Sequence, residues 1–455
     1  MDGWLKAALD YIPEWVDYQM KLVGQPGCVV AAAHRGRVVM EAAFGAADLK
    51  TGRALTPRHR FRVASHSKSF TAAAIIKLRE DGKLSLDDPA GRYVDGLHPE
   101  VAALTLTQLL SHSAGLIRDG IDAGQWQDRR PFLSEKELRA ALTEPPLIAP
   151  STRFKYSNHA FGLAGLVIEA VTGEPYGDWV GREIVAAAKL SETQPDGPAP
   201  RGVPVASGHS GKLPLGHRRI VPGDNPTNVM APATGFVSTA GDLARFFASL
   251  DPGAKRSILT PASRRDMIRR QWTDVDASAQ GGYGLGIMLG KAGDWEWFGH
   301  AGGFQSCISR TVTLPGRDLA ISILTNAVDG PAWAWSDALV HILQTFEQRG
   351  PASAKTGDWK GRWWSLWRTL DFVPMRDHVL VADPSMAVPF TDAAEIAVEG
   401  RGQGTIRHAT GLASYGEGAR LVGGTNDKVK ELWFGGTKFL PEQKFAAELK
   451  RKYKG

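Results

Sequence analysis

Strand-like runs lie at both ends of a long N-terminal region, and helical patterns fill the sequence between them. Residues 28–33 and 38–44 are apolar, partly β-branched runs around a short Gly-containing turn, which is typical of a β-hairpin. Residues 306–314 and 319–324 are two further strand-like runs, around a Pro-Gly turn. From 65 to about 173 the pattern is mainly helical. This order predicts one α/β domain whose sheet joins the two ends of the region.

The length of 455 residues exceeds the usual size of one hydrophobic core, so we expect a second, smaller domain. Residues 349–357 have the Gly- and Pro-containing composition of a linker. Beyond them, short alternating runs such as 394–399 are separated by Gly pairs, which is typical of a small antiparallel barrel or sandwich. The predicted organisation is a domain over 1–348, a linker over 349–357 and an all-β barrel domain over 358–455.

The basic charge of the chain does not indicate nucleic acid binding. The formal net charge is +6, but Lys and Arg are scattered along the sequence, without a stripe. The two cysteines, Cys28 and Cys307, are too few for a disulfide framework. The 12 histidines show no zinc-binding spacing. We therefore expect no metal, no cofactor and no nucleic acid partner.

The N-terminus predicts an amphipathic helix and not a signal peptide. Leu5, Leu9, Ile12 and Val16 recur at helical spacing, and no long apolar core accompanies them. No stretch of the sequence approaches the length of a membrane span. We therefore expect a cytoplasmic protein without a membrane partner.

The first candidate catalytic element is Ser65 with Lys68, at the start of an apolar helical run. A serine at a helix start has its hydroxyl near the positive end of the helix dipole and its backbone N–H free. Lys68 lies three residues on, on the same helix face, so its amine can reach the Ser65 oxygen. A lysine acts as a base for serine when burial or nearby cations lower its pKa. Taken alone, the pair would usually be an N-cap serine and an exposed lysine.

Two further elements carry suitable chemistry. Tyr156 and Asn158 head another apolar helical run, where a tyrosine can relay a proton and an asparagine can bond the lysine and a substrate carbonyl. Taken alone, they describe a surface tyrosine beside a helix cap. Residues 300–303 (His-Ala-Gly-Gly) lie between a strand-like run ending at Phe298 and another beginning near Ser306. Small residues there let a substrate backbone approach, and a free backbone N–H there can point at a developing oxyanion. A β-turn with an exposed histidine has the same pattern.

The order and spacing of the Ser-x-x-Lys, Tyr-Ser-Asn and His-x-Gly elements resemble the penicillin-recognising serine hydrolases. This group contains class C β-lactamases, D-alanyl-D-alanine carboxypeptidases, D-aminopeptidases and related esterases. Residues 106–116, 235–243 and 283–286 also look familial, and the resemblance covers roughly 10–348. It implies a β-lactamase/transpeptidase-like α/β fold, with an antiparallel sheet flanked by helices plus a helical subdomain.

The resemblance also implies the catalytic roles. Ser65 would be the acylated nucleophile and Lys68 its general base. Tyr156 would relay a proton to the leaving group and, later, from the deacylating water.

Four residues would bind the substrate by the same resemblance, namely Asn158, His300, Gly302 and Gly303. Asn158 would support the lysine and the substrate amide. The backbone N–H groups of Ser65 and Gly303 would form the oxyanion hole. His300 stands where the family often has a lysine, whose permanent charge favours substrates with a free carboxylate.

The histidine in place of lysine is mostly neutral at pH 7, so it favours the D-aminopeptidase and esterase branches. The leading hypothesis is an amide hydrolase for short peptides or amino-acid amides, D-selective, acting through an acyl-enzyme. The alternative is a carboxylesterase or acyltransferase with the same machinery. A β-lactamase, a DD-carboxypeptidase and a non-catalytic sensor rank below these. The expected partners are a small-molecule or short-peptide substrate and, as an open alternative to a monomer, further copies of the chain.

The C-terminal domain begins with four clustered tryptophans, at positions 359, 363, 364 and 367. It resembles the lipocalin-like barrels appended to several peptidases of this family. The resemblance implies a structural role, such as shaping the cleft or mediating oligomers, with an independent ligand pocket as the alternative.

Overall fold

A computed structural model describes residues 1–273, 281–400, 402–410, 412–423 and 429–453. These residues form two compact units. We call Gln25–Ser336 the large unit, and Met1–Gly24 together with Asp337–Gly455 the small unit. The first helix thus groups with the C-terminal residues, and the domain boundaries expected from the sequence stay a prediction.

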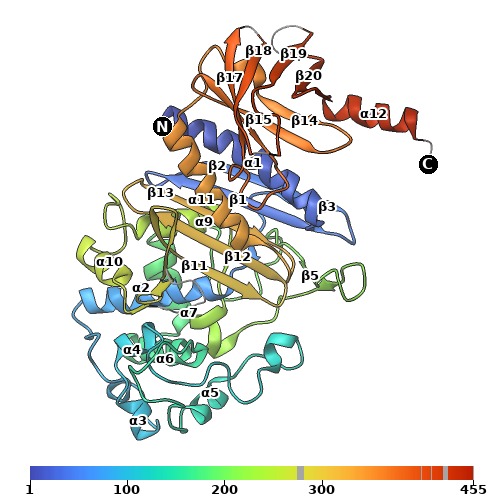
Figure 1. Cartoon of the computed structure of the whole chain (residues 1–455). Coiled ribbons are helices and arrows are strands. Elements are labelled where there is room, and N and C mark those ends of the chain that lie inside the picture. Colours follow the sequence, from blue (N-terminus) through green and yellow to red (C-terminus); the bar gives the residue numbers. More distant parts are fainter. Residues whose placement is uncertain (274–280, 401, 411, 424–428, 454–455) are drawn as a thin grey trace. The chain divides into compact units, whose positions relative to one another are not determined.

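An antiparallel sheet of nine strands forms the centre of the large unit among its described residues. Its strands are β1 (Gly27–His34), β2 (Arg37–Asp48), β3 (Arg53–Ala54), β8 (Trp272–Thr273), β9 (Gly282–Tyr283), β10 (Met288–Ala292), β11 (Trp295–Phe304), β12 (Cys307–Leu314) and β13 (Leu319–Thr325). Their order is β3-β2-β1-β13-β12-β11-β10-β9-β8. β1 pairs with β13 from Cys28 opposite Thr325 to His34 opposite Leu319 (Figure 1). The sheet therefore joins the two ends of the region, as predicted.

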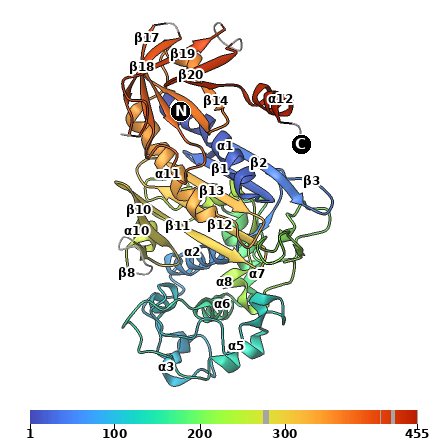
Figure 2. The ribbon, with the colours of Figure 1, turned by 45° about the vertical axis from the view of Figure 1, so that its right-hand side comes forward.

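Helices flank this sheet and form a subdomain beside it. They are α2 (Ser67–Glu80), α3 (Pro99–Ala102), α4 (Leu106–Leu110), α5 (Glu135–Ala141), α6 (Asn158–Thr172), α7 (Tyr176–Val180), α8 (Ala231–Thr234), α9 (Ala240–Ser249) and α10 (Pro261–Ile268). α9 packs against β1, β12 and β13, and α2 packs against α6 and α8. Figures 1 and 2 show α3, α4, α5 and α6 gathered below the sheet. The predicted α/β fold with a helical subdomain is confirmed.

The sequence of α2 explains why its polar residues lie inside the protein. Every residue from Ser67 to Ile76 is buried, because the helix is surrounded by other helices and by the sheet. Alanine at positions 72–74 allows neighbouring backbones to approach closely. Lys68 therefore lies in the interior and not on a solvated helix face.

One prediction about the sheet is wrong. The strand-like run around Phe298 does not end there, because β11 continues to Phe304 and contains His300–Gly303. Glycine has a low intrinsic preference for strands, so the pattern favoured a turn. Pairing with β12, with Gly303 opposite Ile308, holds these residues extended.

The small unit contains an eight-stranded antiparallel barrel with the order β14-β15-β16-β17-β18-β19-β20-β21. The strands are β14 (Gly361–Trp364), β15 (Thr369–Met375), β16 (His378–Ala382), β17 (Ala394–Gly400), β18 (Gln403–His408), β19 (Gly418–Val422), β20 (Glu431–Phe434) and β21 (Thr437–Phe439). Trp364 and Leu440 exchange two backbone hydrogen bonds of 2.8 and 2.9 Å, which nearly closes the barrel. The predicted all-β barrel is confirmed, and its likeness to lipocalins stays a prediction.

The remaining helices are α1 (Gly3–Val23), α11 (Ala332–Arg349) and α12 (Glu442–Lys452). α1 confirms the helix expected at the N-terminus. Over the described residues, we find no helix whose length and apolar character would suit a membrane crossing.

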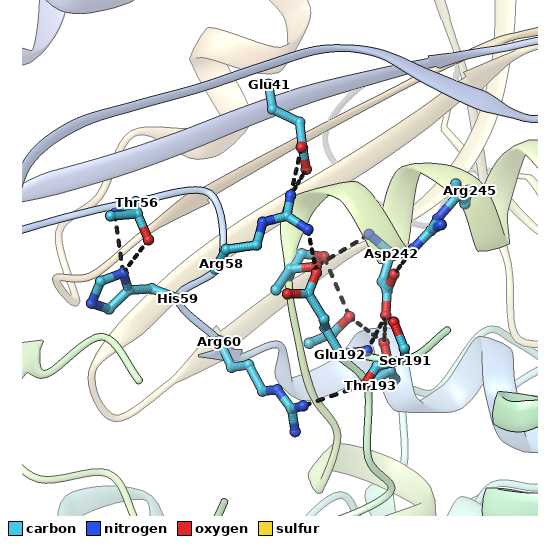
Figure 3. A network of polar contacts seen from close by, with 12 residues as sticks. Glu41, Thr56, Arg58, His59, Arg60, Ser191, Glu192, Thr193, Asp242 and Arg245 are labelled. Atoms are coloured by element: carbon cyan, nitrogen blue, oxygen red, sulfur yellow. Dashed lines mark hydrogen bonds and ion pairs between the residues drawn. The ribbon is translucent and has the colours of Figure 1, made fainter. Parts of the chain in front are cut away.

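A network of polar contacts holds the segment that leads into the candidate nucleophile (Figure 3). Arg58 bonds both Glu41 of β2 and Glu192. The buried carboxylate of Asp242, at the start of α9, accepts from the Glu192 N–H at 2.8 Å and from the Thr193 hydroxyl at 2.9 Å. The segment that follows β3 and carries Arg58 is thereby anchored both to the sheet and to α9.

Candidate active site

Ser65 lies in a short 3-10 turn, Ala64–His66, between strand β4 (Phe61–Arg62) and α2. β4 pairs with β7 (Val237–Ser238). Ala64 has φ of +46°, a left-handed conformation that costs a non-glycine residue roughly 1–3 kcal/mol. Within residues 61–70, Ser65 is the one residue that is not buried. The turn therefore presents the Ser65 hydroxyl to solvent from a fixed backbone.

Lys68 is fully buried, and its Nζ has three neighbours. It lies 2.6 Å from Oδ1 of Asn158, 2.8 Å from the Ala233 carbonyl oxygen and 3.1 Å from Oγ of Ser65. Burial lowers the pKa of Lys68 well below its ordinary value. A neutral amine has two N–H groups for the two carbonyl acceptors and one lone pair that accepts the Ser65 hydroxyl proton. The three contacts therefore match a lysine that acts as a base.

Tyr156 is the second neighbour of the nucleophile. Its hydroxyl lies 2.8 Å from Oγ of Ser65, and its ring centroid lies 4.8 Å from Nζ of Lys68. Burial raises the pKa of Tyr156 above its ordinary value, so the side chain is a protonated phenol near pH 7. It can therefore donate a proton at the Ser65 oxygen, and it cannot serve as the resting base.

Asn158 begins α6, directly after Ser157, whose hydroxyl caps the helix by accepting from the Ala160 N–H at 3.1 Å. This cap fixes where the helix starts and points the Asn158 amide at Lys68. The amide Nδ2 donates to Oδ1 of Asp119 at 2.6 Å. Asn158 therefore links the lysine to a carboxylate that the sequence patterns did not indicate.

His300 is buried, with 2% of its surface exposed. Its Nε2 lies 2.9 Å from the Tyr283 hydroxyl, and its Nδ1 lies 3.0 Å from the Ala301 nitrogen. Burial lowers the pKa of His300 well below its ordinary value, so the ring is neutral. The neutral ring agrees with the expectation that this position carries no permanent charge. Contact between His300 and a substrate stays a prediction.

Gly302 and Gly303 lie where β11 has a free edge. β10 pairs with β11 only up to Gly299, and β12 is the strand paired with residues 300–304 in the part of the chain that the structure describes. A Cβ on Gly302 would lie 2.1 Å from the Val63 carbonyl oxygen, so β11 lies directly against the backbone that precedes the nucleophile. A Cβ on Gly303 would meet Ile308 at 3.5 Å, an ordinary contact.

This difference predicts opposite outcomes for two adjacent substitutions. Gly302→Ala should destabilise the protein by about 1–3 kcal/mol and misplace the turn that carries Ser65, because the backbone must move apart. Gly303→Ala should leave the free energy of unfolding nearly unchanged. It should also change the rate of labelling of Ser65 by a fluorophosphonate by less than about twofold, because the backbone N–H is retained. Urea unfolding and labelling rates measure both effects, and equal behaviour of the two variants would contradict the close approach.

Three further residues touch the site, namely His112, Asp119 and Tyr283. The His112 ring lies 4.1 Å from the Tyr156 ring, and its Nδ1 accepts from the Ser157 N–H at 3.1 Å. The Tyr283 hydroxyl lies within hydrogen-bonding distance of His300, and its ring centroid lies 4.8 Å from that of His112, with the two rings tilted by 52°. His112 and Tyr283 lie within the familial stretches 106–116 and 283–286, for which the sequence predicted no catalytic role, and no pattern pointed to Asp119. The described residues contain no cluster of three or more His, Cys, Asp or Glu arranged to hold a metal ion.

Comparison with known proteins identifies the relatives of this chain. The Beta-lactamase family matches residues 13–342. Esterase EstB of Burkholderia gladioli is 27% identical over 343 residues, which is 66% of this chain and 84% of that protein. The structure of a D-stereospecific amidohydrolase from Streptomyces sp. has a TM-score of 0.58 at 26% identity, covering 71% of this chain and 94% of that one.

A further structure covers both units. The octameric penicillin-binding protein homologue from Pyrococcus abyssi has a TM-score of 0.65 at 21% identity, over 95% of this chain and 99% of that chain. At this identity the likeness concerns the fold alone. The family match spans the large unit, including the turn of Ser65, the start of α6 and β11. The chain therefore belongs to the Beta-lactamase family.

Proposed function

We propose that this chain is a serine hydrolase that forms an acyl-enzyme at Ser65 and cleaves amide bonds of short peptides or amino-acid amides, with D-selectivity. One observation carries the proposal. Oγ of Ser65 lies 3.1 Å from Nζ of Lys68 and 2.8 Å from the Tyr156 hydroxyl. The first group is a base with a lowered pKa, and the second is a phenol that keeps its proton. Acylation needs both functions at one oxygen atom.

In the proposed reaction Lys68 takes the Ser65 proton as Oγ attacks the substrate carbonyl carbon. The oxyanion that forms accepts hydrogen bonds from the N–H groups of Ser65 and Gly303. The C–N bond then breaks, and Tyr156 gives its proton to the leaving nitrogen and recovers one from the Lys68 ammonium. Water then loses a proton through Tyr156 to Lys68 and attacks the acyl carbon. The bond to Oγ breaks, and the Lys68 ammonium returns its proton to the Ser65 oxygen.

Amide cleavage is favoured over ester cleavage by the chemistry of the leaving group. An amine leaves only when its nitrogen is protonated, and Tyr156 holds a proton 2.8 Å from the oxygen that attacks the substrate. Similarity to a D-stereospecific amidohydrolase supports the D-selective amide. Similarity to an esterase supports the second candidate, a carboxylesterase or acyltransferase. The neutral His300 disfavours substrates that need a cation at their carboxylate, such as penicillins.

The test has two stages. First, a fluorophosphonate should label Ser65 in the wild-type chain and not in Ser65→Ala, as read by peptide mass. Second, the enzyme is offered D- and L-aminoacyl p-nitroanilides, p-nitrophenyl butyrate and a chromogenic cephalosporin. Hydrolysis of the D-anilide above the L-anilide supports the proposal. Turnover of the butyrate without either anilide would establish the esterase candidate in its place.

For the small unit we propose a structural role, with assembly of the chain into a homo-oligomer. Apolar side chains fill the barrel interior, including the fully buried Trp359 and Ile396. A filled interior supports packing rather than ligand binding. Light scattering coupled to size-exclusion chromatography measures the mass of the assembly, and a monomer would contradict the oligomer.

A further inference from the structure

Asp119 lies in the loop that follows α4 and is 9% exposed. Its Oδ1 accepts from Nδ2 of Asn158 at 2.6 Å and from the Trp126 indole N–H at 2.8 Å. Its Oδ2 accepts from Nε of Arg118 at 3.0 Å. Two donors close to it in sequence and one from the start of α6 therefore hold this carboxylate beside the candidate base.

An ionised carboxylate accepts hydrogen bonds and cannot donate them. The amide group of Asn158 must therefore turn its NH₂ toward Asp119, which leaves Oδ1 facing Nζ of Lys68 at 2.6 Å. In the opposite orientation the NH₂ would face the lysine. It would repel the ammonium form, and in the neutral form it would donate into the lone pair that Ser65 needs.

Several charged or titratable groups face Lys68 from the surrounding elements. His112, Arg118 and Asp119 all come from the loop after α4. Tyr156 lies before α6, and His300 lies on β11. Burial lowers the pKa of Lys68, the Asp119 carboxylate raises it, and Arg118 lowers it. Asp119 is thus the negative charge that opposes these effects.

We propose that Asp119 is a positioning residue of the acylation site, which fixes the Asn158 amide so that the lone pair of Lys68 stays available to Ser65. The inference rests on the proposed function of Ser65 and Lys68. Asp119 touches neither substrate nor nucleophile and acts through Asn158. Its effect on the lysine has a definite sign, since the carboxylate favours the ammonium form.

Three variants separate this role from a general effect on folding. Asp119→Asn has nearly the same shape but no charge, and it can present either an acceptor or a donor to Asn158. Arg118→Gln removes the cation and leaves Asp119 in place. Asp122→Asn is the matched control, because this exposed carboxylate of the same loop accepts from the Gly124 N–H at 2.8 Å, which an amide oxygen can also do.

The measurement is the second-order rate constant for labelling of Ser65 by a fluorophosphonate, from pH 5 to 10. In a plot of this rate constant against pH, the rise reports the loss of the proton from Lys68. For Asp119→Asn this rising limb should move to lower pH by about one unit, because the lysine loses a neighbouring negative charge. Its plateau should fall about tenfold, the equivalent of one hydrogen bond to a charged group. Arg118→Gln should move the limb to higher pH, and Asp122→Asn should match the wild type.

If Asp119 had a structural role alone, the plateau rate of Asp119→Asn would fall only in proportion to the fraction of folded protein, and the rising limb would stay at the wild-type pH. That result would overturn the proposal. A second readout needs no reaction at Ser65. In protein labelled with [ε-¹³C]lysine, the Lys68 signal is identified by its loss in Lys68→Met, and its titration midpoint should fall in Asp119→Asn. An unchanged midpoint would contradict the role of Asp119, whereas an unlabelled wild-type Ser65 would contradict the proposed function.

Discussion

Replacing Lys68 with methionine should lower the rate of Ser65 acylation by at least about 1000-fold, within the range of general-base catalysis. Methionine fills the space of the lysine side chain but has no lone pair that accepts the Ser65 proton. The Tyr156 hydroxyl at 2.8 Å cannot replace it, because its raised pKa keeps it protonated. The rate of labelling by a fluorophosphonate at pH 8 measures the effect, together with turnover of the best substrate of the panel.

The matched control is Lys77→Met, on the same helix. Lys77 is partly exposed and pairs with Asp81 one turn further on, so its loss should change the labelling rate by less than about twofold. A Lys68→Met variant that is labelled at the wild-type rate would show that another group takes the proton. In that case the assignment of the base, though not of the nucleophile, would be wrong.

Lys68→Met should also change how the stability of the protein depends on pH, and the sign of this change can be derived. The pKa of Lys68 is lower in the folded chain than its ordinary value of 10.5, so the unfolded chain binds the extra proton. The stability of the wild type therefore rises with pH between the lowered pKa and about 10.5. Lys68→Met lacks this dependence, so its stability relative to the wild type should be greatest below the lowered pKa. Urea unfolding at pH 6 and pH 10 tests this sign.

Three central strands of the large unit's sheet could be predicted because their sequences carry the information locally. The runs that became β1, β12 and β13 are rich in apolar and β-branched residues, and all eight residues of β1 are buried. Turns between them contain Gly or Pro, which limits where each strand ends. The antiparallel order of the complete sheet came from the resemblance and not from these patterns.

The nucleophile and its neighbours differ in how far sequence spacing could predict their positions. Ser65 and Lys68 are three residues apart, so the start of a helix is enough to bring them together. Tyr156 and Asn158 reach the same pair only because α6 packs against α2, a contact that no local pattern encodes. The structure brings these four residues together, and it engages His300 with Tyr283 inside the protein.

Asp119 and the end of β11 could not be predicted for physical reasons. An Asp in a loop is usually solvated, and its buried position depends on Asn158, which lies 39 residues further along the chain. Gly302 has no side chain that could contribute to a strand pattern. It is held extended by pairing with β12, and it lies so close to Val63 that a Cβ would stand 2.1 Å from the Val63 carbonyl oxygen. Long-range packing, which one sequence does not display, determines both features.

Replacing Tyr156 with phenylalanine should slow acylation by an anilide far more than acylation by an activated ester. The variant keeps the ring beside Lys68 and loses the hydroxyl that lies 2.8 Å from Oγ of Ser65. Cleavage of an aminoacyl anilide should fall by about 1000-fold, because the leaving nitrogen loses its proton donor. Cleavage of p-nitrophenyl butyrate should fall only about tenfold, because a nitrophenolate leaves without a proton. The ratio of the two acylation rate constants, measured in the first turnover, gives the difference, because deacylation also uses Tyr156.

Tyr176→Phe is the matched control, since it removes a buried phenol hydroxyl that lies 2.7 Å from Oγ1 of Thr71 and makes no contact with Ser65. It should cost about 1 kcal/mol of stability and leave the ratio of anilide to ester turnover unchanged. An equal fall of both activities in Tyr156→Phe would mean that the hydroxyl only orients the serine. The selective fall is expected because burial keeps the Tyr156 proton in place until a basic nitrogen arrives to accept it.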